Sequence, residues 1–445
     1  MKEEESVMAY SVGAVSLGCN KNRVDTETAL GLLKERGFRI VSDPADADII
    51  MINTCGFIDP AKEESINTIL EMAEYKTSGR CRLLVVTGCL IQRYEKELLQ
   101  ELPEIDLMLG VNQYASLPDR IEEALHGSAL HSCQDDFSYY EHDRVLTTPF
   151  YSAYIRIGEG CSNRCTFCAI PMIRGPYRSR GEKNILDEVR SFASRGVREH
   201  ILVAQDTTRW GTDEGGHTLL PSLMKKIADI PGVDWLRVLY CYPDETNDEL
   251  LDLMAGTPNI CPYLDIPIQH INSDILKRMH RRGTREDILR CVRGAKARGL
   301  TLRTTLITGF PGETEDQFQE LLDFVEEAEF DRLGAFAYSP EENTPAARMK
   351  DQIPEEIKQE RLDRLMTLQS RISLKNNRKR IGSVETVLVT DLNEDGMALG
   401  RSRTEAPETD GEILFTCGSR KPDIGSFVQV RITDAKTYDL TGEMI

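Results

Sequence analysis

Short apolar stretches alternate with amphipathic ones along most of this chain, first over residues 11–126 and again over residues 153–339. Short apolar runs are typical of buried strands, and the stretches between them repeat their apolar residues with the spacing of a helix. Repeated strand–helix units predict parallel sheets with helices on their faces. We therefore expect an α/β chain in which a doubly wound parallel domain precedes a partial (βα)6 barrel.

The pattern changes twice outside these two regions. Residues 127–146 are polar and irregular, and we interpret them as a linker. The carboxy-terminal residues form short strand-like runs separated by turns, which favours a small β-barrel of the oligonucleotide-binding (OB) kind. Its strand candidates are 384–389, 397–401, 411–415, 427–432 and 437–440. The expected domains are therefore 10–126, 147–378, which ends in a long charged helix, and 380–445.

Three cysteines, Cys161, Cys165 and Cys168, directly follow the strand expected at 153–158. Thiolates are the soft ligands that iron–sulfur clusters and zinc select, and three of them are one short of a closed four-ligand site. A [4Fe–4S] cluster bound here would keep one iron open for another ligand. The alternative is a structural zinc site with a distant fourth ligand. However, no second cysteine or histidine pair follows at zinc-finger spacing.

A second set of cysteines follows the first three strands expected in the amino-terminal domain. Cys19, Cys55 and Cys89 each lie beside a glycine at a strand end. The carboxyl ends of parallel strands share one edge of the sheet, where ligands bind. We therefore expect the three sulfurs to converge on a second iron–sulfur site. Scattered or redox-active cysteines remain the alternative interpretation.

Composition restricts the compartment and the partners. The chain has 12 cysteines, which in a protein of 445 residues do not suggest a secreted disulfide scaffold. It shows neither a long apolar run nor a signal peptide at its start, so we expect a cytoplasmic protein without a membrane contact. The net charge of −19 argues against a broadly basic nucleic-acid surface and suits a basic protein partner.

The Cys-x-x-x-Cys-x-x-Cys spacing at 161–168 resembles the signature of radical S-adenosylmethionine (SAM) enzymes. With the amino-terminal cysteines and the terminal β-barrel, called TRAM in that family, the chain resembles the radical SAM methylthiotransferases along nearly its full length. Within the family it looks most like the type that modifies a ribosomal protein. The motifs are Gln205-Asp-Thr-Thr-Arg-Trp-Gly211, Thr308-Gly-Phe-Pro-Gly-Glu-Thr314 and Tyr338-Ser-Pro-Glu-Glu-Asn-Thr-Pro345. The type that modifies transfer RNA usually carries asparagine in place of Asp206.

The resemblance implies two [4Fe–4S] clusters and SAM as cofactors. The cluster at Cys161, Cys165 and Cys168 would cleave SAM to a radical, and the one at Cys19, Cys55 and Cys89 would carry the sulfur to be inserted. The product would be a methylthio group on the β-carbon of an aspartate in the twelfth small-subunit ribosomal protein. Such an enzyme also needs a low-potential electron donor, flavodoxin- or ferredoxin-like, and a sulfur donor.

Further polar residues lie at the expected barrel strand ends. Gln205, Asp206, Gln269 and Gly309 would face SAM if the barrel forms as expected. Arg174, Arg178 and Arg180 follow the triplet and would either neutralise a cluster or form a solvated face.

Charge separates the two substrate hypotheses. Residues 380–445 contain twelve acidic and seven basic side chains, a balance of −5, which suits a basic ribosomal protein better than an RNA backbone. Methylthiolation of a transfer RNA adenosine remains the alternative. A third reading, from another class, is a non-catalytic iron–sulfur protein that binds ribosomes.

Overall fold

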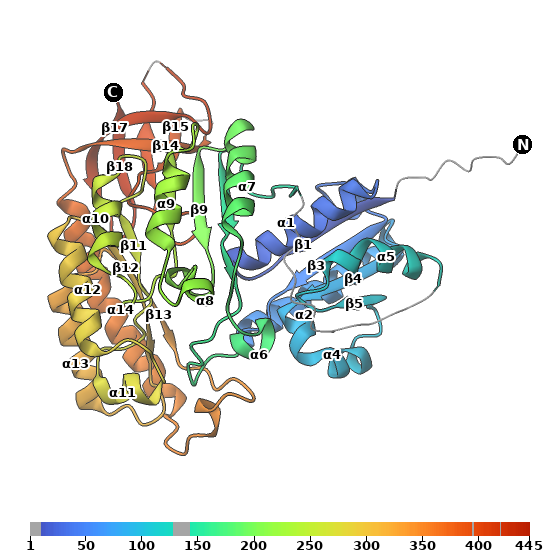
Figure 1. Ribbon diagram of the computed structural model, residues 1–445, viewed down its shortest axis with the longest axis horizontal. Helices are drawn as coiled ribbons and strands as arrows, with labels where there is room; N and C mark the ends of the chain where they lie inside the picture. Colours follow the sequence, from blue (N-terminus) through green and yellow to red (C-terminus); the bar gives the residue numbers. More distant parts are fainter. Residues whose placement is uncertain (1–9, 128–142, 394–395, 419) are drawn as a thin grey trace, which may run out of the picture.

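The computed structural model describes residues 10–127, 143–393, 396–418 and 420–445. In Figure 1 the amino-terminal sheet lies to one side, the central strands and helices form the body, and the last strands sit against one end of that body. The α/β fold class predicted from the alternation of apolar stretches is confirmed, as are its two parallel arrangements and its terminal β-barrel.

Five parallel strands form the amino-terminal sheet in the order β2-β1-β3-β4-β5. From β1 the chain winds one way to β2 and the other way to β3, which makes the sheet doubly wound. The central strands β3 and β4 are buried along their whole length, so their apolar runs are uninterrupted. The short edge strand β2 was not predicted. The elements are β1 (Ser11–Ser16), α1 (Asn20–Glu35), β2 (Arg39–Ile40), β3 (Ile49–Thr54), α2 (Asp59–Ala73), α3 (Tyr75–Ser78), β4 (Leu83–Gly88), α4 (Cys89–Glu101), β5 (Leu107–Leu109) and α5 (Leu117–Leu125).

Six parallel strands form the arc of the central barrel in chain order, β6-β9-β10 followed by β11-β12-β13. A bridge between Leu236 and Ile260 joins the two halves. The strands are β6 (Ser152–Arg156), β9 (Glu199–Val203), β10 (Trp235–Val238), β11 (Tyr263–Asp265), β12 (Thr301–Thr308) and β13 (Arg332–Ala337). The helices are α7 (Glu182–Ser194), α9 (Leu220–Ala228), α10 (Asp248–Gly256), α11 (Ser273–Arg278), α12 (Arg285–Ala297), α13 (Glu315–Ala328) and α14 (Glu355–Arg378).

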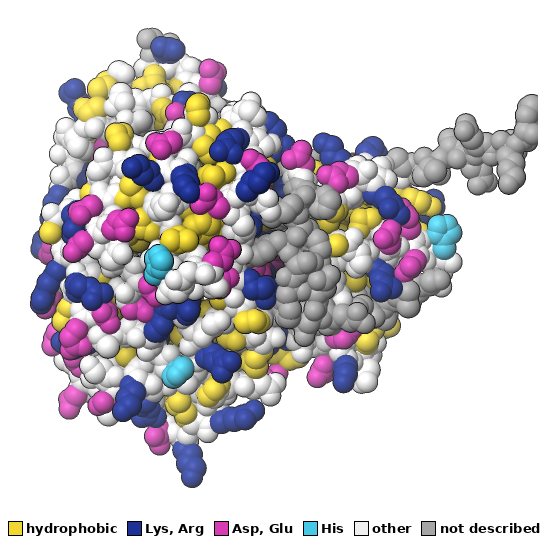
Figure 2. Space-filling view, viewed as in Figure 1, with side chains coloured by type: hydrophobic (Ala, Val, Ile, Leu, Met, Phe, Trp, Pro, Cys, Tyr) yellow, Lys and Arg dark blue, Asp and Glu magenta, His cyan; other side chains and the backbone are white. Residues whose placement is uncertain are grey.

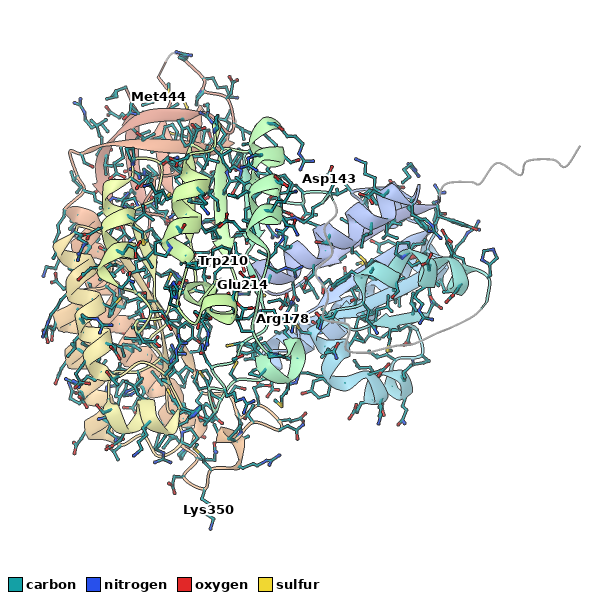
Figure 3. All side chains as sticks on the ribbon, viewed as in Figure 1. Asp143, Arg178, Trp210, Glu214, Lys350 and Met444 are labelled. Carbon is teal, nitrogen blue, oxygen red and sulfur yellow. The ribbon has the colours of Figure 1, made fainter. Side chains whose placement is uncertain are left out.

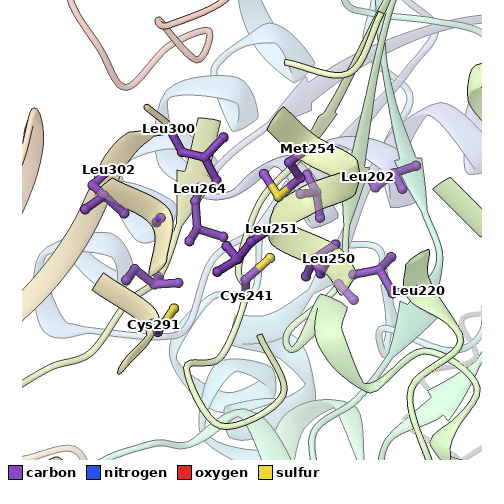
Figure 4. Packing of buried hydrophobic residues seen from close by; sticks show 14 of the residues in the cluster. Leu202, Leu220, Cys241, Leu250, Leu251, Met254, Leu264, Cys291, Leu300 and Leu302 are labelled. Carbon is purple, nitrogen blue, oxygen red and sulfur yellow. The ribbon is translucent and has the colours of Figure 1, made fainter. Parts of the chain in front are cut away.

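The main core fills the space between the barrel strands and their outer helices. Leu250, Leu251 and Met254 of α10 pack there against strand residues such as Leu264 (Figure 4). Cys291 lies in the same apolar cluster and is 1% exposed. Cysteines of this kind are buried as small apolar side chains, so they are separate from the two candidate ligand sets.

The carboxy-terminal strands close into a barrel in the order β14-β15-β16-β18-β17. The strands are β14 (Val384–Leu392), β15 (Met397–Arg401), β16 (Ile413–Thr416), β17 (Phe427–Ala435) and β18 (Leu440–Met444). The last strand begins where the predicted strand 437–440 was expected to end. The reason is a turn in which the amide of Lys436 donates to the carbonyl of Asp439 at 2.8 Å.

This β-barrel docks on the amino ends of the central strands. Glu199, the first residue of β9, is fully buried and accepts hydrogen bonds from Arg401 at 2.6 Å and from Arg237 at 3.1 Å. Trp235, which begins β10, contacts Phe427 with ring centres 4.7 Å apart. The opposite, carboxyl ends of the central strands therefore stay available for chemistry.

Replacing Glu199 with glutamine is expected to destabilise the fold by about 3–5 kcal/mol at pH 7, because it leaves two buried guanidinium groups without their counter-charge. Burial alone would raise the pKa of Glu199, but Arg401 and Arg237 lower it from 4.5 to about 2. The stability that the ionised Glu199 carboxylate gives the fold is thus complete above pH 4.5 and is lost as the pH falls to about 2. Denaturant titrations of wild type and Glu199→Gln over this pH range should show that the difference in their free energies of unfolding vanishes as the pH approaches 2. A constant difference would contradict this account. Asp187→Asn, in an exposed ion pair, is the control.

The predicted linker 127–146 falls mostly outside the described residues. Within its described part, Arg144 is buried and its guanidinium donates to Glu27 at 3.0 Å and to Glu188 at 2.8 Å. These contacts tie the segment to α1 and α7. Among the helices that the structure describes, none has the length and apolar character needed to cross a membrane.

Candidate functional site

Cys19, Cys55 and Cys89 lie at the carboxyl ends of three neighbouring strands. Cys19 precedes α1, Cys55 follows β3 directly, and Cys89 begins α4 after β4. Because β1, β3 and β4 are adjacent and parallel, their ends share one edge of the sheet. The connections reverse direction between β1 and β3, which is where doubly wound sheets bind ligands.

A glycine brings two of these cysteine segments together. A Cβ atom on Gly18 would lie 2.7 Å from Cys55 Cβ and 2.9 Å from Cys55 Sγ. Gly18 has a φ of +81°, a conformation that favours glycine. The Cys19 segment can therefore approach Cys55 closely. Cys19 is exposed at this edge, whereas Cys55 and Cys89 are buried.

Two influences act in opposite directions on the ionisation of the buried thiols: burial opposes it, and a nearby arginine favours it. Burial raises the pKa of Cys55, and it raises that of Cys89 to about 12. Arg174 lowers the pKa of both groups, and its Nη2 donates toward Cys89 Sγ at 3.6 Å. A thiol must lose its proton to bind a metal, so a cation beside the sulfurs favours the ligating form.

Arg174 also connects the two cysteine sets. It ends α6 (Ile170–Arg174), the short helix that follows Cys168. Its guanidinium is 1% exposed and donates to Asp25 of α1 at 2.8 Å and to Glu159 of the barrel at 3.1 Å. Burial would raise the pKa of Glu159, but Arg174 and Arg156 hold it below its ordinary value. The charged network therefore spans the boundary between the amino-terminal sheet and the central barrel.

The other two arginines after the triplet have different surroundings. Arg178, labelled in Figure 3 where the barrel faces the amino-terminal sheet, donates to the carbonyl of Pro176 at 3.1 Å. Arg180 pairs with Glu188 at 2.5 Å. Among the described contacts of these three arginines, the only one with a cysteine is that of Arg174 with Cys89.

Cys161, Cys165 and Cys168 lie on a loop beyond β6 and β7 (Gly158–Glu159). The amide of Cys161 donates to the carbonyl of Gly175 at 3.0 Å, which fixes the start of the loop. Burial raises the pKa of Cys161 to about 11 and also raises that of Cys168. Cys161 and Cys165 are buried, and Cys168 is partly buried.

Arg281 places a positive charge against this second set. Its guanidinium donates to Cys165 Sγ at 3.5 Å and to the carbonyl of Pro267 at 2.6 Å. The same group lies 4.3 Å from the ring centre of Tyr242. Each cysteine set is thus accompanied by one arginine, buried in the case of Arg174 and partly buried in the case of Arg281.

Two of the residues predicted to bind SAM follow β9. Asp206 contacts the cysteine loop itself, and Gln205 contacts Glu159, two residues before Cys161. Asp206 is fully buried; its Oδ2 accepts from Asn163 at 2.8 Å and its Oδ1 accepts from Thr208 at 2.6 Å. Asn163 lies between Cys161 and Cys165, so Asp206 fixes the loop. Burial raises the pKa of Asp206. Gln205 donates to Glu159 at 3.2 Å.

Gln269 and Gly309 lie at strand ends of the second half of the barrel. Gln269 has a φ of 71°, and its backbone N–H donates to the carbonyl of Thr305 at 2.9 Å. A Cβ atom on Gly309 would lie 2.4 Å from Lys358 of α14, so close packing against this helix explains why glycine occupies the position. The SAM contacts of Gln205, Asp206, Gln269 and Gly309 stay predictions.

The donor chemistry at both sets fits an iron–sulfur cluster. Among the described residues, no three His, Cys, Asp or Glu side chains are placed to share one metal ion. A four-iron cluster instead distributes its thiolate ligands over several iron atoms. Each set offers three thiols and an arginine that offsets their charge. Gln205 Oε1 is buried and has no hydrogen-bond partner in the described part of the chain, which leaves a polar atom for a ligand near the Cys161 loop.

Sequence reasoning missed Lys21, Asn163, Glu159 and Arg281. Lys21 is 7% exposed, and its Nζ lies 3.4 Å from the ring centre of Tyr240 at the end of β10. Asn163 alone carried a local signal, because it lies within the cysteine triplet.

Three family models match successive parts of the chain. They are "Uncharacterized protein family UPF0004" over residues 11–110, the radical SAM superfamily over residues 155–325 and the TRAM domain over residues 381–445. These matches follow the order of the three structural parts described above.

Solved structures of radical SAM enzymes share the fold. TsrM, a radical S-adenosylmethionine methyltransferase from Kitasatospora setae solved with tryptophan and a SAM analogue, has a TM-score of 0.57 at 14% identity and covers 85% of this chain and 78% of its own. OxsB, solved with aqua-cobalamin and S-adenosylmethionine, has a TM-score of 0.52 at 14% identity and covers 82% of this chain and 56% of its own. Identity at this level shows the fold alone.

The fold and the matching models define a radical SAM enzyme with an additional amino-terminal domain and a TRAM domain. Proteins named "Ribosomal protein uS12 methylthiotransferase RimO" are similar over nearly the whole chain. The one from Desulforamulus reducens is 50% identical and covers 98% of this chain and 99% of its own. The one from Heliobacterium modesticaldum is 48% identical and covers 99% and 96%. The chain belongs to the RimO methylthiotransferase family and is a transferase, as the motifs predicted.

Proposed function

We propose that this enzyme adds a methylthio group to the β-carbon of an aspartate in ribosomal protein uS12. The observation that carries the proposal is the pair of three-cysteine sets joined through Arg174, in a chain whose relatives are named for this activity on uS12. A β C–H bond is not acidic enough for an ordinary base, which is why a radical reaction is required.

The proposal gives each predicted site residue a role. Cys161, Cys165 and Cys168 would hold one [4Fe–4S] cluster, and Cys19, Cys55 and Cys89 a second. Gln205, Asp206, Gln269 and Gly309 would line the SAM site. When bound, these groups supply reductive cleavage of SAM, hydrogen abstraction, the inserted sulfur and its methyl group.

The chain's own residues would position these groups and exclude water. Asp206 holds the loop of Cys161, Cys165 and Cys168 through Asn163, and Arg281 supplies positive charge at Cys165. Arg174 does the same at Cys89 while it fixes α1 against the barrel. Around buried Cys55, Cys89 and Arg174, exclusion of water lowers the local dielectric constant, so charges there interact strongly.

The partners follow from the reaction and from charge. The substrate would be a basic small-subunit ribosomal protein, met by a terminal β-barrel with a balance of −5 from twelve acidic and seven basic residues. On the face shown in Figure 2, basic and acidic side chains are interspersed over the body of the molecule. We also infer a flavodoxin- or ferredoxin-like electron donor, a sulfur donor and a cytoplasmic location. The proposed domains are 10–126, 147–378 and 380–445.

The proposal predicts that the anaerobically reconstituted protein transfers a methylthio group to uS12. In a strain that lacks this chain, mass spectrometry should find uS12 lighter by one methylthio group, with transfer RNA unchanged. Restoring the gene should restore the mass. Loss of a methylthio group from a transfer RNA adenosine would reject the proposal in favour of the transfer RNA type. A reconstituted protein that binds iron but cannot cleave SAM to deoxyadenosine would point to a non-catalytic iron–sulfur protein.

A further inference from the structure

Lys21 is a buried cation at the junction between the amino-terminal sheet and the central barrel. Its side chain is nine-tenths buried, with 7% of the residue exposed. The ammonium lies over the ring of Tyr240, 3.4 Å from its centre. The neighbouring Asn20 donates to Tyr240 Oη at 3.3 Å, so two consecutive residues of α1 contact the same tyrosine.

No carboxylate in the described part of the chain neutralises this ammonium. Among the described residues, no carboxylate oxygen lies within 4.0 Å of Lys21 Nζ, whereas Arg174 nearby pairs with both Asp25 and Glu159. Removing a charge from water is costly unless a counter-charge replaces the lost hydration. The face of an aromatic ring compensates only part of that cost. The surroundings of Lys21 therefore favour an anion from outside the chain.

The neighbours of Lys21 lead toward both cysteine sets. On one side it follows Cys19 by two residues. On the other side Tyr240 is two residues from Tyr242, which stacks on Arg281, and Arg281 donates to Cys165. Tyr240 has a φ of 62°, an uncommon backbone conformation for a bulky residue and one that concentrates at functional sites.

We propose that Lys21 binds the side-chain carboxylate of the aspartate that is modified. The inference rests on the proposed function. The β-carbon that accepts sulfur is bonded directly to the carboxylate carbon, so the carboxylate must lie beside the sulfur site at Cys19, Cys55 and Cys89. On that side Lys21 is a cation that has no carboxylate partner among the described residues. Under the proposed function, the carboxylate of SAM would bind at the other cysteine set, where Arg281 supplies the positive charge.

A charged partner for the carboxylate would also give specificity. A site built to bind one polar group rejects an analogue that lacks it, because the buried partner is then left unpaired. Asparagine has nearly the same shape as aspartate but no negative charge. Lys21 should therefore distinguish the two side chains.

The test is binding of two fluorescent peptides to the reconstituted enzyme, measured by anisotropy at fixed salt. One peptide carries the aspartate loop of uS12, and the other carries asparagine at the modified position. Wild type should bind the aspartate peptide at least about 10-fold more tightly, as expected when a charge-assisted hydrogen bond is lost. Lys21→Met should bind the two peptides equally, and Lys21→Arg should keep most of the preference. Lys34→Met, an exposed position on the same helix, is the control.

Three results would overturn the assignment. The first is wild type that binds both peptides equally, a result that does not depend on whether any variant folds. The second is Lys21→Met with normal iron content and an undiminished preference for aspartate. The third is loss of SAM affinity in Lys21→Met with an unchanged peptide preference, which would assign Lys21 to the cofactor. Methylthio transfer by wild type, read separately by peptide mass, decides the proposed function itself.

Discussion

Replacing Cys55 with alanine is expected to abolish methylthio transfer while deoxyadenosine is still formed from SAM. Cys55 directly follows β3 in the amino-terminal sheet, whereas Cys161, Cys165 and Cys168 lie on a barrel loop that other residues fix. Loss of one of three ligands should remove the cluster of its own set only. Iron per chain should therefore fall by about half. Liquid chromatography of deoxyadenosine and mass spectrometry of the peptide measure the two reactions separately.

A matched control is available in the same sheet. Cys81 is buried like Cys55, but it precedes β4 at the amino end of the strands, away from the proposed ligand edge. Its Sγ lies 3.5 Å from the carbonyl of Leu83. Cys81→Ala should keep full iron content and both reactions. If folded Cys55→Ala lost SAM cleavage as well as sulfur transfer, separate roles for the two sets would be wrong.

The cysteine positions at strand ends were accessible to sequence reasoning because the signals are local. An apolar run predicts a buried strand, and the residue after it must lie at the strand's end. Parallel order then places Cys19, Cys55 and Cys89 at one edge, since β1, β3 and β4 are neighbours. The same logic predicted the central arc and most strands of the terminal barrel. It did not specify the last strand, because the turn at 436–439 has no strong local pattern.

The charged contacts between the two cysteine sets could not be predicted in this way. Arg174 and Asp25 are 149 positions apart, and Asn20 and Tyr240 are 220 apart. Nothing in the local sequence distinguishes Lys21 from an ordinary solvated lysine in the first turn of a helix. Its burial arises only when α1 meets the barrel. Single-sequence patterns report periodicity within an element, whereas these pairs depend on how elements dock.

Replacing Arg174 with methionine is expected to destabilise the cluster-free protein by about 3–5 kcal/mol. The change leaves Asp25 and Glu159 buried at the same boundary without their shared cation, and an uncompensated buried charge has a cost of this size. Arg156, which also contacts both carboxylates, would limit the loss. Denaturant unfolding at pH 7 measures the effect. Arg190→Met, in an exposed pair with Asp187, should leave stability unchanged.

Restoring charge balance should recover much of that stability. In Arg174→Met, the further change Glu159→Gln removes the excess negative charge and leaves Arg156 paired with Asp25, so the double variant is expected to unfold at higher denaturant than the single one. Arg174→Lys should retain less of the stability, because a single ammonium cannot donate to both carboxylates as the planar guanidinium does. Even when stable, the double variant should load less iron at the Cys19, Cys55 and Cys89 set, since Cys89 has lost its cation. Full iron content in that variant would show that Arg174 acts on folding alone.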